Sequence, residues 1–115
     1  MMPDKMLSLK TCENESAMEI LGEEEVSKYI QLMDNWEIID NFLRKVYHFK
    51  AFKQSLAFVN TVANIADVIG YFPQISFSKS LVQINLGNGS DLIPCDFILA
   101  SKMDAAYDLM YSINS

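Results

Sequence analysis

Residues 51–73, AFKQSLAFVNTVANIADVIGYFP, decide the fold because they hold a long helix, its stop and the entry to a strand. Apolar side chains recur at spacings of three and four over residues 51–69, which predicts a helix. Gly70 is the expected helix stop. The apolar side chains form two adjacent stripes, Phe52, Leu56, Val59, Ala63 and Ala66 beside Phe58, Val62, Ile65 and Ile69.

The two stripes together are wider than the ~100° arc that a simple surface helix buries. One explanation is a central helix that lies deep on a sheet. The other is that part of this apolar surface meets another subunit, and the two explanations are compatible. The second predicts a homo-oligomer, either a C₂ dimer or a dimer of dimers.

Helices and strands are predicted on both sides of this segment. Helical spacing predicts helices over residues 23–33 and 94–111. Alternation predicts strands over 36–39 and 42–50, joined tightly by Asp40-Asn41. Residues 75–78 and 82–86 are either two paired strands or one long bent strand. The order α-β-β-α-β-β-α predicts an α+β fold, an antiparallel four-stranded sheet with helices packed on one face.

Length and composition indicate one globular domain. The chain has 115 residues, of which 50% are hydrophobic and 21% charged, and this balance is typical of a folded domain. Residues 1–20 are polar and patternless, so we expect a flexible N-terminal tail at 1–20 and a single domain at 21–115.

Charge and hydropathy bear on the partners and the location. The net charge is −6, and an acidic chain without a basic stripe is not expected to bind nucleic acid directly. No apolar run approaches the ~20 residues that span a bilayer, and residues 1–16 have no apolar core of a secretory signal. A cytoplasmic protein without membrane contact is the expectation.

The two cysteines, Cys12 and Cys95, lie in different segments without C-x-x-C spacing. We therefore expect free thiols in a reducing compartment rather than a disulfide or a zinc site. No metal and no cofactor is expected.

A set of residues in order resembles the pterin-4a-carbinolamine dehydratase (4a-hydroxytetrahydrobiopterin dehydratase) family over roughly residues 21–109. No single piece is diagnostic, but the set is fairly specific for the fold. The matching residues are Trp36, 48–52 (HFKAF), Phe58, 62–63, 66–67, Pro73, 82–86 (VQINL), 96–100 (DFILA) and Asp104.

The resemblance implies dehydration of a 4a-hydroxytetrahydropterin in tetrahydrobiopterin recycling. The leaving hydroxyl must be protonated while a ring nitrogen loses a proton, and histidine is the side chain suited to both near neutral pH. The family's His-His-Pro motif falls on Tyr71, Phe72 and Pro73, and its loop histidine falls near Asn88-Gly89. Every expected imidazole is therefore replaced. The sole histidine, His48, matches a position that is not catalytic in the family, and we expect it to be structural or solvent-facing.

The resemblance places the family site at Asp67, Tyr71 and Phe72, with Asp67, Pro73 and Asp96 as pterin-binding positions. Asp67 and Asp96 match the family's carboxylates, although each also fits an ordinary role, as an exposed helix residue and as a first-turn acid favoured by the helix dipole. A phenol with a pKa of about 10 is a poor base at neutral pH, and Phe72 can only stack. Weak or lost dehydratase activity is therefore expected.

The alternative function is a non-catalytic binding or assembly protein on the same fold. The resemblance offers two precedents, a RuBisCO assembly factor and a transcriptional coactivator. Under either function we expect a dimer or tetramer, and the other expected partner is a pterin or another protein.

Overall fold

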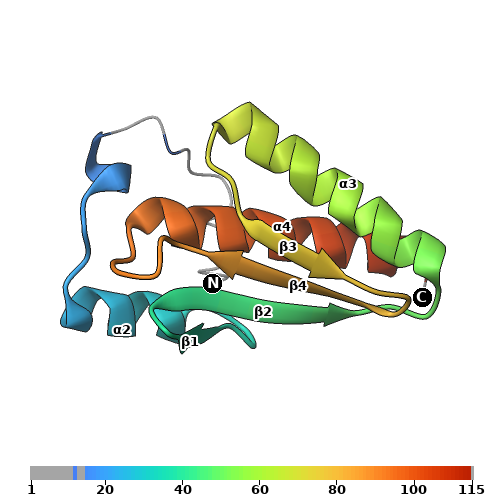
Figure 1. Ribbon diagram of the computed structural model, residues 1–115, viewed down its shortest axis with the longest axis horizontal. Helices are drawn as coiled ribbons and strands as arrows, with labels where there is room; N and C mark the ends of the chain where they lie inside the picture. Colours follow the sequence, from blue (N-terminus) through green and yellow to red (C-terminus); the bar gives the residue numbers. More distant parts are fainter. Residues whose placement is uncertain (1–11, 13–14, 115) are drawn as a thin grey trace.

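The computed structural model describes residues 12 and 15–114, and it has the predicted order of helices and strands (Figure 1). A short 3₁₀ helix precedes the predicted elements. The elements are η1 (Glu15–Met18), α2 (Glu23–Gln31), β1 (Glu37–Ile39), β2 (Phe42–His48), α3 (Phe52–Ile69), β3 (Gln74–Phe77), β4 (Leu81–Leu86) and α4 (Pro94–Asn114). None of the described helices is both long and apolar enough to cross a membrane.

Two hairpins build the sheet. Asp40 and Asn41 both have positive φ, 52° and 65°, which is the backbone of a two-residue turn matched to the twist of its strands. The second hairpin joins β3 to β4, with the Ser78 N–H donating to the Leu81 carbonyl oxygen at 2.9 Å. The segment from residue 74 to 86 is therefore two paired strands and not one bent strand.

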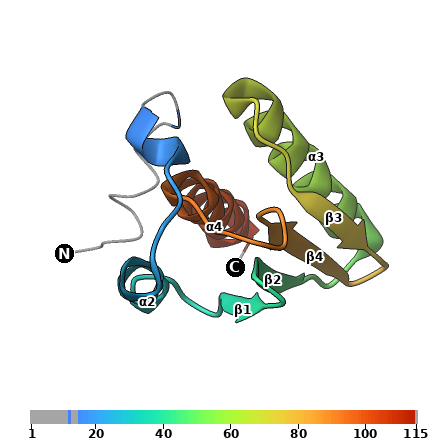
Figure 2. The ribbon, with the colours of Figure 1, turned by 60° about the vertical axis from the view of Figure 1, so that its left-hand side comes forward.

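The four strands pair antiparallel in the order β1-β2-β4-β3, and the helices lie on one face of the sheet (Figure 2). The predicted α+β fold is thus confirmed. Alternate residues of each strand point to the two faces. The side chains on the helix-covered face form the strand part of the core, namely Leu43, Tyr47, Val82, Ile84 and Leu86.

The deeply buried helix is α4 and not α3, so the expectation of a deep central helix over 51–69 is wrong. The side chains that α4 buries completely are Cys95, Asp96, Phe97, Leu99, Ala100 and Met103. In contrast α3 buries one narrow stripe, Ser55, Phe58, Val62 and Ala66. The stripe that begins with Phe52 and Leu56 faces outward at these two residues, which are 50% and 40% exposed, although its last member, Ala66, is buried. The explanation by subunit contact stays a prediction.

A buried carboxylate fixes α4 against the sheet. Asp104 accepts hydrogen bonds from the Trp36 indole N–H at 3.0 Å and the Tyr47 hydroxyl at 2.6 Å. The Lys45 ammonium, from the same strand as Tyr47, donates to it at 2.7 Å. Because a buried charge is costly unless it is paired and hydrogen-bonded, this cluster fixes which side of α4 faces β2.

Cys12 and Cys95 form a disulfide across 83 positions of sequence, so the expectation of two free thiols is wrong. Their distance in sequence concealed that η1 packs on α4, where Ala17 is buried. Of the predicted tail, the structure describes residue 12 and residues 15–20, and the rest lies outside the described residues. Flexibility of that tail stays a prediction.

The disulfide should contribute substantially to stability because it closes a long loop. A chain-entropy treatment of an 83-residue separation gives on the order of 4 kcal/mol as an upper value. We expect the Cys12→Ser/Cys95→Ser variant to unfold at lower urea concentration than the oxidised wild type. Reduction should shift the wild-type midpoint and leave the variant unchanged; equal midpoints for oxidised and reduced wild type would contradict the bond.

Candidate active site

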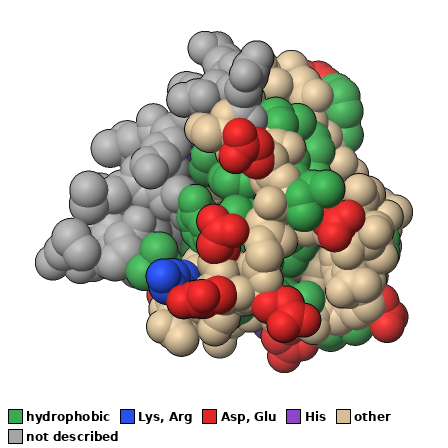
Figure 3. All heavy atoms as spheres, turned by 90° about the vertical axis from the view of Figure 1, so that its left-hand side faces the viewer, with side chains coloured by type: hydrophobic (Ala, Val, Ile, Leu, Met, Phe, Trp, Pro, Cys, Tyr) green, Lys and Arg blue, Asp and Glu red, His purple; other side chains and the backbone are tan. Residues whose placement is uncertain are grey.

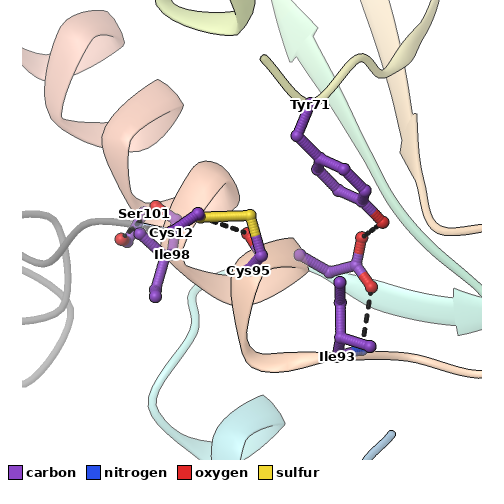
Figure 4. The surroundings of a disulfide bond; sticks show 7 residues. Cys12, Tyr71, Ile93, Cys95, Ile98 and Ser101 are labelled. Atoms are coloured by element: carbon purple, nitrogen blue, oxygen red, sulfur yellow. Dashed lines mark hydrogen bonds between the residues drawn. A yellow bond between two sulfur atoms is a disulfide. The ribbon is translucent and has the colours of Figure 1, made fainter. Parts of the chain in front are cut away.

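The predicted site lies where the turn after α3 meets the first turn of α4 (Figure 4). Gly70 ends α3 in the left-handed conformation, with φ 79°, and its N–H donates to the Ala66 carbonyl oxygen. This glycine is a true requirement, since side chains other than glycine rarely adopt that backbone. The reversal turns the next residue, Tyr71, toward the start of α4, where its hydroxyl donates to Asp96 Oδ1 at 2.5 Å.

Asp96 is fully buried and caps its own helix. Its second oxygen, Oδ2, accepts the Ile93 backbone N–H at 2.9 Å. Ile93 immediately precedes Pro94, the first residue of the helix, so Asp96 stands at the third helical position, where an acid commonly reaches back to the N-cap. Both carboxyl oxygens therefore have a donor from within the chain.

Burial determines the electrostatics of the pair. Desolvation raises the pKa of Asp96, while hydrogen bonds from Tyr71 and the Ile93 N–H act in the opposite direction. The pKa of Tyr71 is raised above its ordinary value by desolvation first, then by its hydrogen bond to Asp96 and by the charge of that group. Tyr71 is consequently protonated at neutral pH and acts as a hydrogen-bond donor. Because its pKa is raised, its deprotonated form is scarcer at neutral pH than that of a free phenol, so it is less available as a general base.

The other predicted positions do not converge on this pair. Phe72 is 65% exposed, and Pro73 is half-buried. Asp67 is exposed in the last turn of α3, near the negative end of the helix dipole, which disfavours a carboxylate. Within the described chain it has no ion pair. The structure thus brings Tyr71 and Asp96 into contact, and it leaves Asp67 and Phe72 open to solvent.

The loop that matches the family's third histidine is built around glycine and asparagine. Gly89 has φ 83°, and a Cβ there would lie 3.1 Å from the Phe42 ring. Asn88 Oδ1 accepts the backbone N–H groups of Ser90 and Asp91, both at 2.9 Å. A histidine at either position would strain the loop or remove the bonds that shape it.

His48 lies at the end of β2, exposed, and its carbonyl oxygen accepts the Tyr107 hydroxyl at 3.0 Å. It lines a hollow of about 440 Å³ together with Lys45, Asp34 and Asp108. None of the predicted site residues, Asp67, Tyr71, Phe72, Pro73 and Asp96, lines that hollow.

Sequence reasoning missed the contact between Tyr71 and Asp96 and the bond from Ile93. The bond from Ile93 had a signal in the sequence. A proline at the first helical position, here Pro94, with an acid at the third, here Asp96, is typical of a helix start. The contact between Tyr71 and Asp96 had none, because it joins residues 25 positions apart. The Cys12–Cys95 disulfide, directly beside Asp96, was also missed (Figure 4).

Tyr71→Phe should destabilise the protein in a pH-dependent way. Loss of a hydrogen bond to a buried carboxyl costs ~1–3 kcal/mol, and it removes an influence that lowers the pKa of Asp96. Because the folded pKa of Asp96 is raised, the stability linked to it is present below its unfolded pKa, about 4, and is lost as pH rises through the folded pKa. In the variant that loss extends to higher pH.

Urea unfolding of wild type and variant across acidic to neutral pH measures this. The expected result is a difference in unfolding free energy that grows with pH. Tyr29→Phe is the matched control, since Tyr29 is also half-buried and its ring stacks on Phe97 at 4.9 Å. A pH-independent difference for Tyr71→Phe would show that the hydroxyl does not bond the carboxyl group.

Comparisons with known proteins show to which family this chain belongs. The family model described as Pterin 4 alpha carbinolamine dehydratase matches residues 19–106. A relative from Nitrosospira multiformis, provisionally named pterin-4-alpha-carbinolamine dehydratase, is 32% identical and covers 90% of this chain and 94% of its own. One from Alkaliphilus metalliredigens with the same provisional name is 33% identical, over 73% of this chain and 79% of its own.

Two solved structures share the fold. A transcriptional coactivator/pterin dehydratase from Brucella melitensis aligns with a TM-score of 0.70 at 23% identity, over 76% of this chain and 97% of that one. A pterin dehydratase-like RuBisCO assembly factor of the alpha-carboxysome aligns with a TM-score of 0.53 at 27% identity, over 61% and 83%. This chain belongs to the pterin-4a-carbinolamine dehydratase family.

Proposed function

We propose that this protein is a dehydratase-family member in which dehydration of 4a-hydroxytetrahydropterin is weak or lost. The observation that carries the proposal is the Tyr71–Asp96 hydrogen bond at the position of the family's histidine motif. It supports the proposal because the family resemblance implies a group at this position that exchanges a proton near neutral pH, and the phenol of Tyr71 has a raised pKa.

Access to the carboxylates supports the same proposal. Asp96 is fully buried with both oxygens bonded, so a pterin would have to displace Tyr71 to reach it. Asp67 is open to solvent, and it is the carboxylate left available to bind an amino-pyrimidine edge. One accessible carboxylate and a phenyl ring do not together provide both the proton donor and the proton acceptor that the loss of water requires.

A direct dehydration assay tests the proposal. Each missing acid–base group typically costs ~10²–10⁴-fold, so the wild-type protein should raise the rate little above the spontaneous reaction. Tyr71→His/Phe72→His should raise it at least ~10-fold further, because imidazoles titrate near neutral pH.

Tyr71→Gln/Phe72→Gln is the control for this assay, since it is polar at both positions but cannot exchange protons. It should stay at the spontaneous rate. Robust turnover by the wild type would overturn the proposal. Turnover that survives Tyr71→Gln/Phe72→Gln would show instead that the activity resides elsewhere.

The second candidate is a non-catalytic binding or assembly protein. The similarity to the RuBisCO assembly factor favours it, because that protein is named for assembly and is described as dehydratase-like. A cytoplasmic location remains a prediction, and the Cys12–Cys95 disulfide weighs against a reducing compartment, where such bonds seldom persist.

Self-association is part of the proposal under either function. The outward stripe of α3 meets the edge strand β3, where the Phe52 and Phe77 rings stack at 6.1 Å while 50% and 42% exposed. With Leu56 these rings form an apolar surface, the α3–β3 surface, beside β3, an edge strand of the described sheet. Exposed apolar patches next to open edges are typical of interfaces.

Light scattering after size exclusion should show a dimer or tetramer at micromolar concentration. Leu56→Asp/Phe77→Asp should give a monomer, because two buried carboxylates without partners oppose association. Val46→Asp is the control, because Val46 is an apolar residue of β2 with 37% exposure that lies outside the α3–β3 surface. It should leave the oligomer intact. A monomeric wild type, or a double variant with unchanged mass, would exclude this interface.

A further inference from the structure

A second surface lies near β1, at the edge of the sheet opposite to β3. It is a groove of about 510 Å³ between α2, the β1–β2 hairpin and the loop that precedes α4. Its apolar lining comes from Val26 and Ile30 of α2, Ile38 of β1, and Leu21 and Leu92. The size is within the ~300–1,000 Å³ usual for binding pockets.

Part of the apolar lining is exposed on the face of the sheet against which the helices pack. Ile38 pairs with the completely buried Leu43, so it points to the helix-covered face of the sheet, yet it is 39% exposed. The helix α2 buries no residue completely. Its Tyr29 stacks on Phe97 of α4 at 4.9 Å, and this anchor leaves Val26 and Ile30 half-buried toward the groove.

The rim of the groove is acidic. Glu23, at the start of α2, and Asp91, in the loop, are its charged lining residues, and no lysine or arginine of the described chain lines it. Figure 3 shows this end of the molecule, where red carboxylates are distributed around green apolar surface and blue is confined to one spot. Such a rim repels phosphate and anionic lipid and attracts cationic groups.

The walls of the groove are held in place before any partner binds. The Leu21 N–H donates to the Leu92 carbonyl oxygen at 2.9 Å, which joins the entry of α2 to the loop. The Asp91 backbone N–H donates to Asn88 Oδ1, which holds Asp91 in place. The disulfide joins Cys12 to Cys95 in the first turn of α4, just after the loop. A preformed site loses less conformational entropy when it binds.

We propose that this groove binds a segment of a partner protein that presents aliphatic side chains flanked by lysine or arginine. The apolar floor selects the aliphatic groups, and Glu23 with Asp91 selects the flanking cations. The proposal is independent of turnover at the family site, because no groove residue belongs to that site.

Two labelled helical peptides test the chemistry. They share one leucine pattern and carry either lysine or glutamate at the flanking positions. Fluorescence anisotropy with the oxidised full-length protein should give at least ~10-fold tighter binding of the lysine peptide, and added salt should weaken that binding.

Variants locate the site. Ile38→Asp should weaken binding of the lysine peptide at least ~10-fold, because it places a carboxylate on the apolar floor. Val46→Asp is the matched control, since its side chain is 37% exposed against 39% for Ile38 and lies outside the groove. Glu23→Lys/Asp91→Lys alters only exposed side chains and should reverse the preference to the glutamate peptide.

Several results would overturn the proposal. They are no binding of either peptide, equal binding of both, equal effects of Ile38→Asp and Val46→Asp, or an unchanged preference after the charge reversal. The dehydration assay does not enter these outcomes, so failure here is distinguishable from failure of the proposed function.

Discussion

The buried carboxylate of Asp104 is the constraint on which the arrangement depends. It receives an indole N–H, a phenol O–H and an ammonium from the β2 strand and the segment before β1. Breaking a buried charged pair by removing one partner typically costs ~3–5 kcal/mol, because the charge left behind has neither water nor a counterion. A helix with apolar residues on most sides has no preferred rotation from hydrophobicity alone, so the polar contact decides which side of α4 faces the sheet.

That rotation determines what the start of α4 presents. Asp96 lies two turns before Asp104, about 12 Å along the axis, and the fixed helix directs it toward the turn after α3 while Cys95 meets Cys12. The left-handed Gly70 supplies the other half of the contact by turning Tyr71 inward. The Tyr71–Asp96 contact thus depends both on the rotation of α4 that Asp104 fixes and on the glycine end of α3, and it leaves the Asp96 carboxyl group fully buried.

Periodicity in the sequence predicted the elements and their order because those depend on local spacing. Alternation in β2 and β4 matched the buried side of the sheet, and Asp40-Asn41 formed the tight turn. How deeply each helix is buried was not predictable in the same way. The segment 51–69 was expected to lie deep, yet α4 is deeper, since it buries even the polar residues Asp96, Ser101 and Asp104, each with a hydrogen bond. The disulfide and the Tyr71–Asp96 bond join distant positions, and no local pattern encodes such pairs.

The Tyr71–Asp96 hydrogen bond, which carries the proposed loss of activity, also stabilises the fold. Asp96 caps α4 and accepts the Tyr71 hydroxyl, so both of its carboxyl oxygens already have donors within the chain. Part of the exposed apolar surface of the molecule lies elsewhere. It lies at the two edges of the sheet, where the stacked Phe52 and Phe77 flank the edge strand β3 and where Ile38 is exposed on the face against which the helices pack. If dehydration is weak or lost, as we propose, these exposed apolar surfaces are the parts of the molecule best suited to contact with other chains.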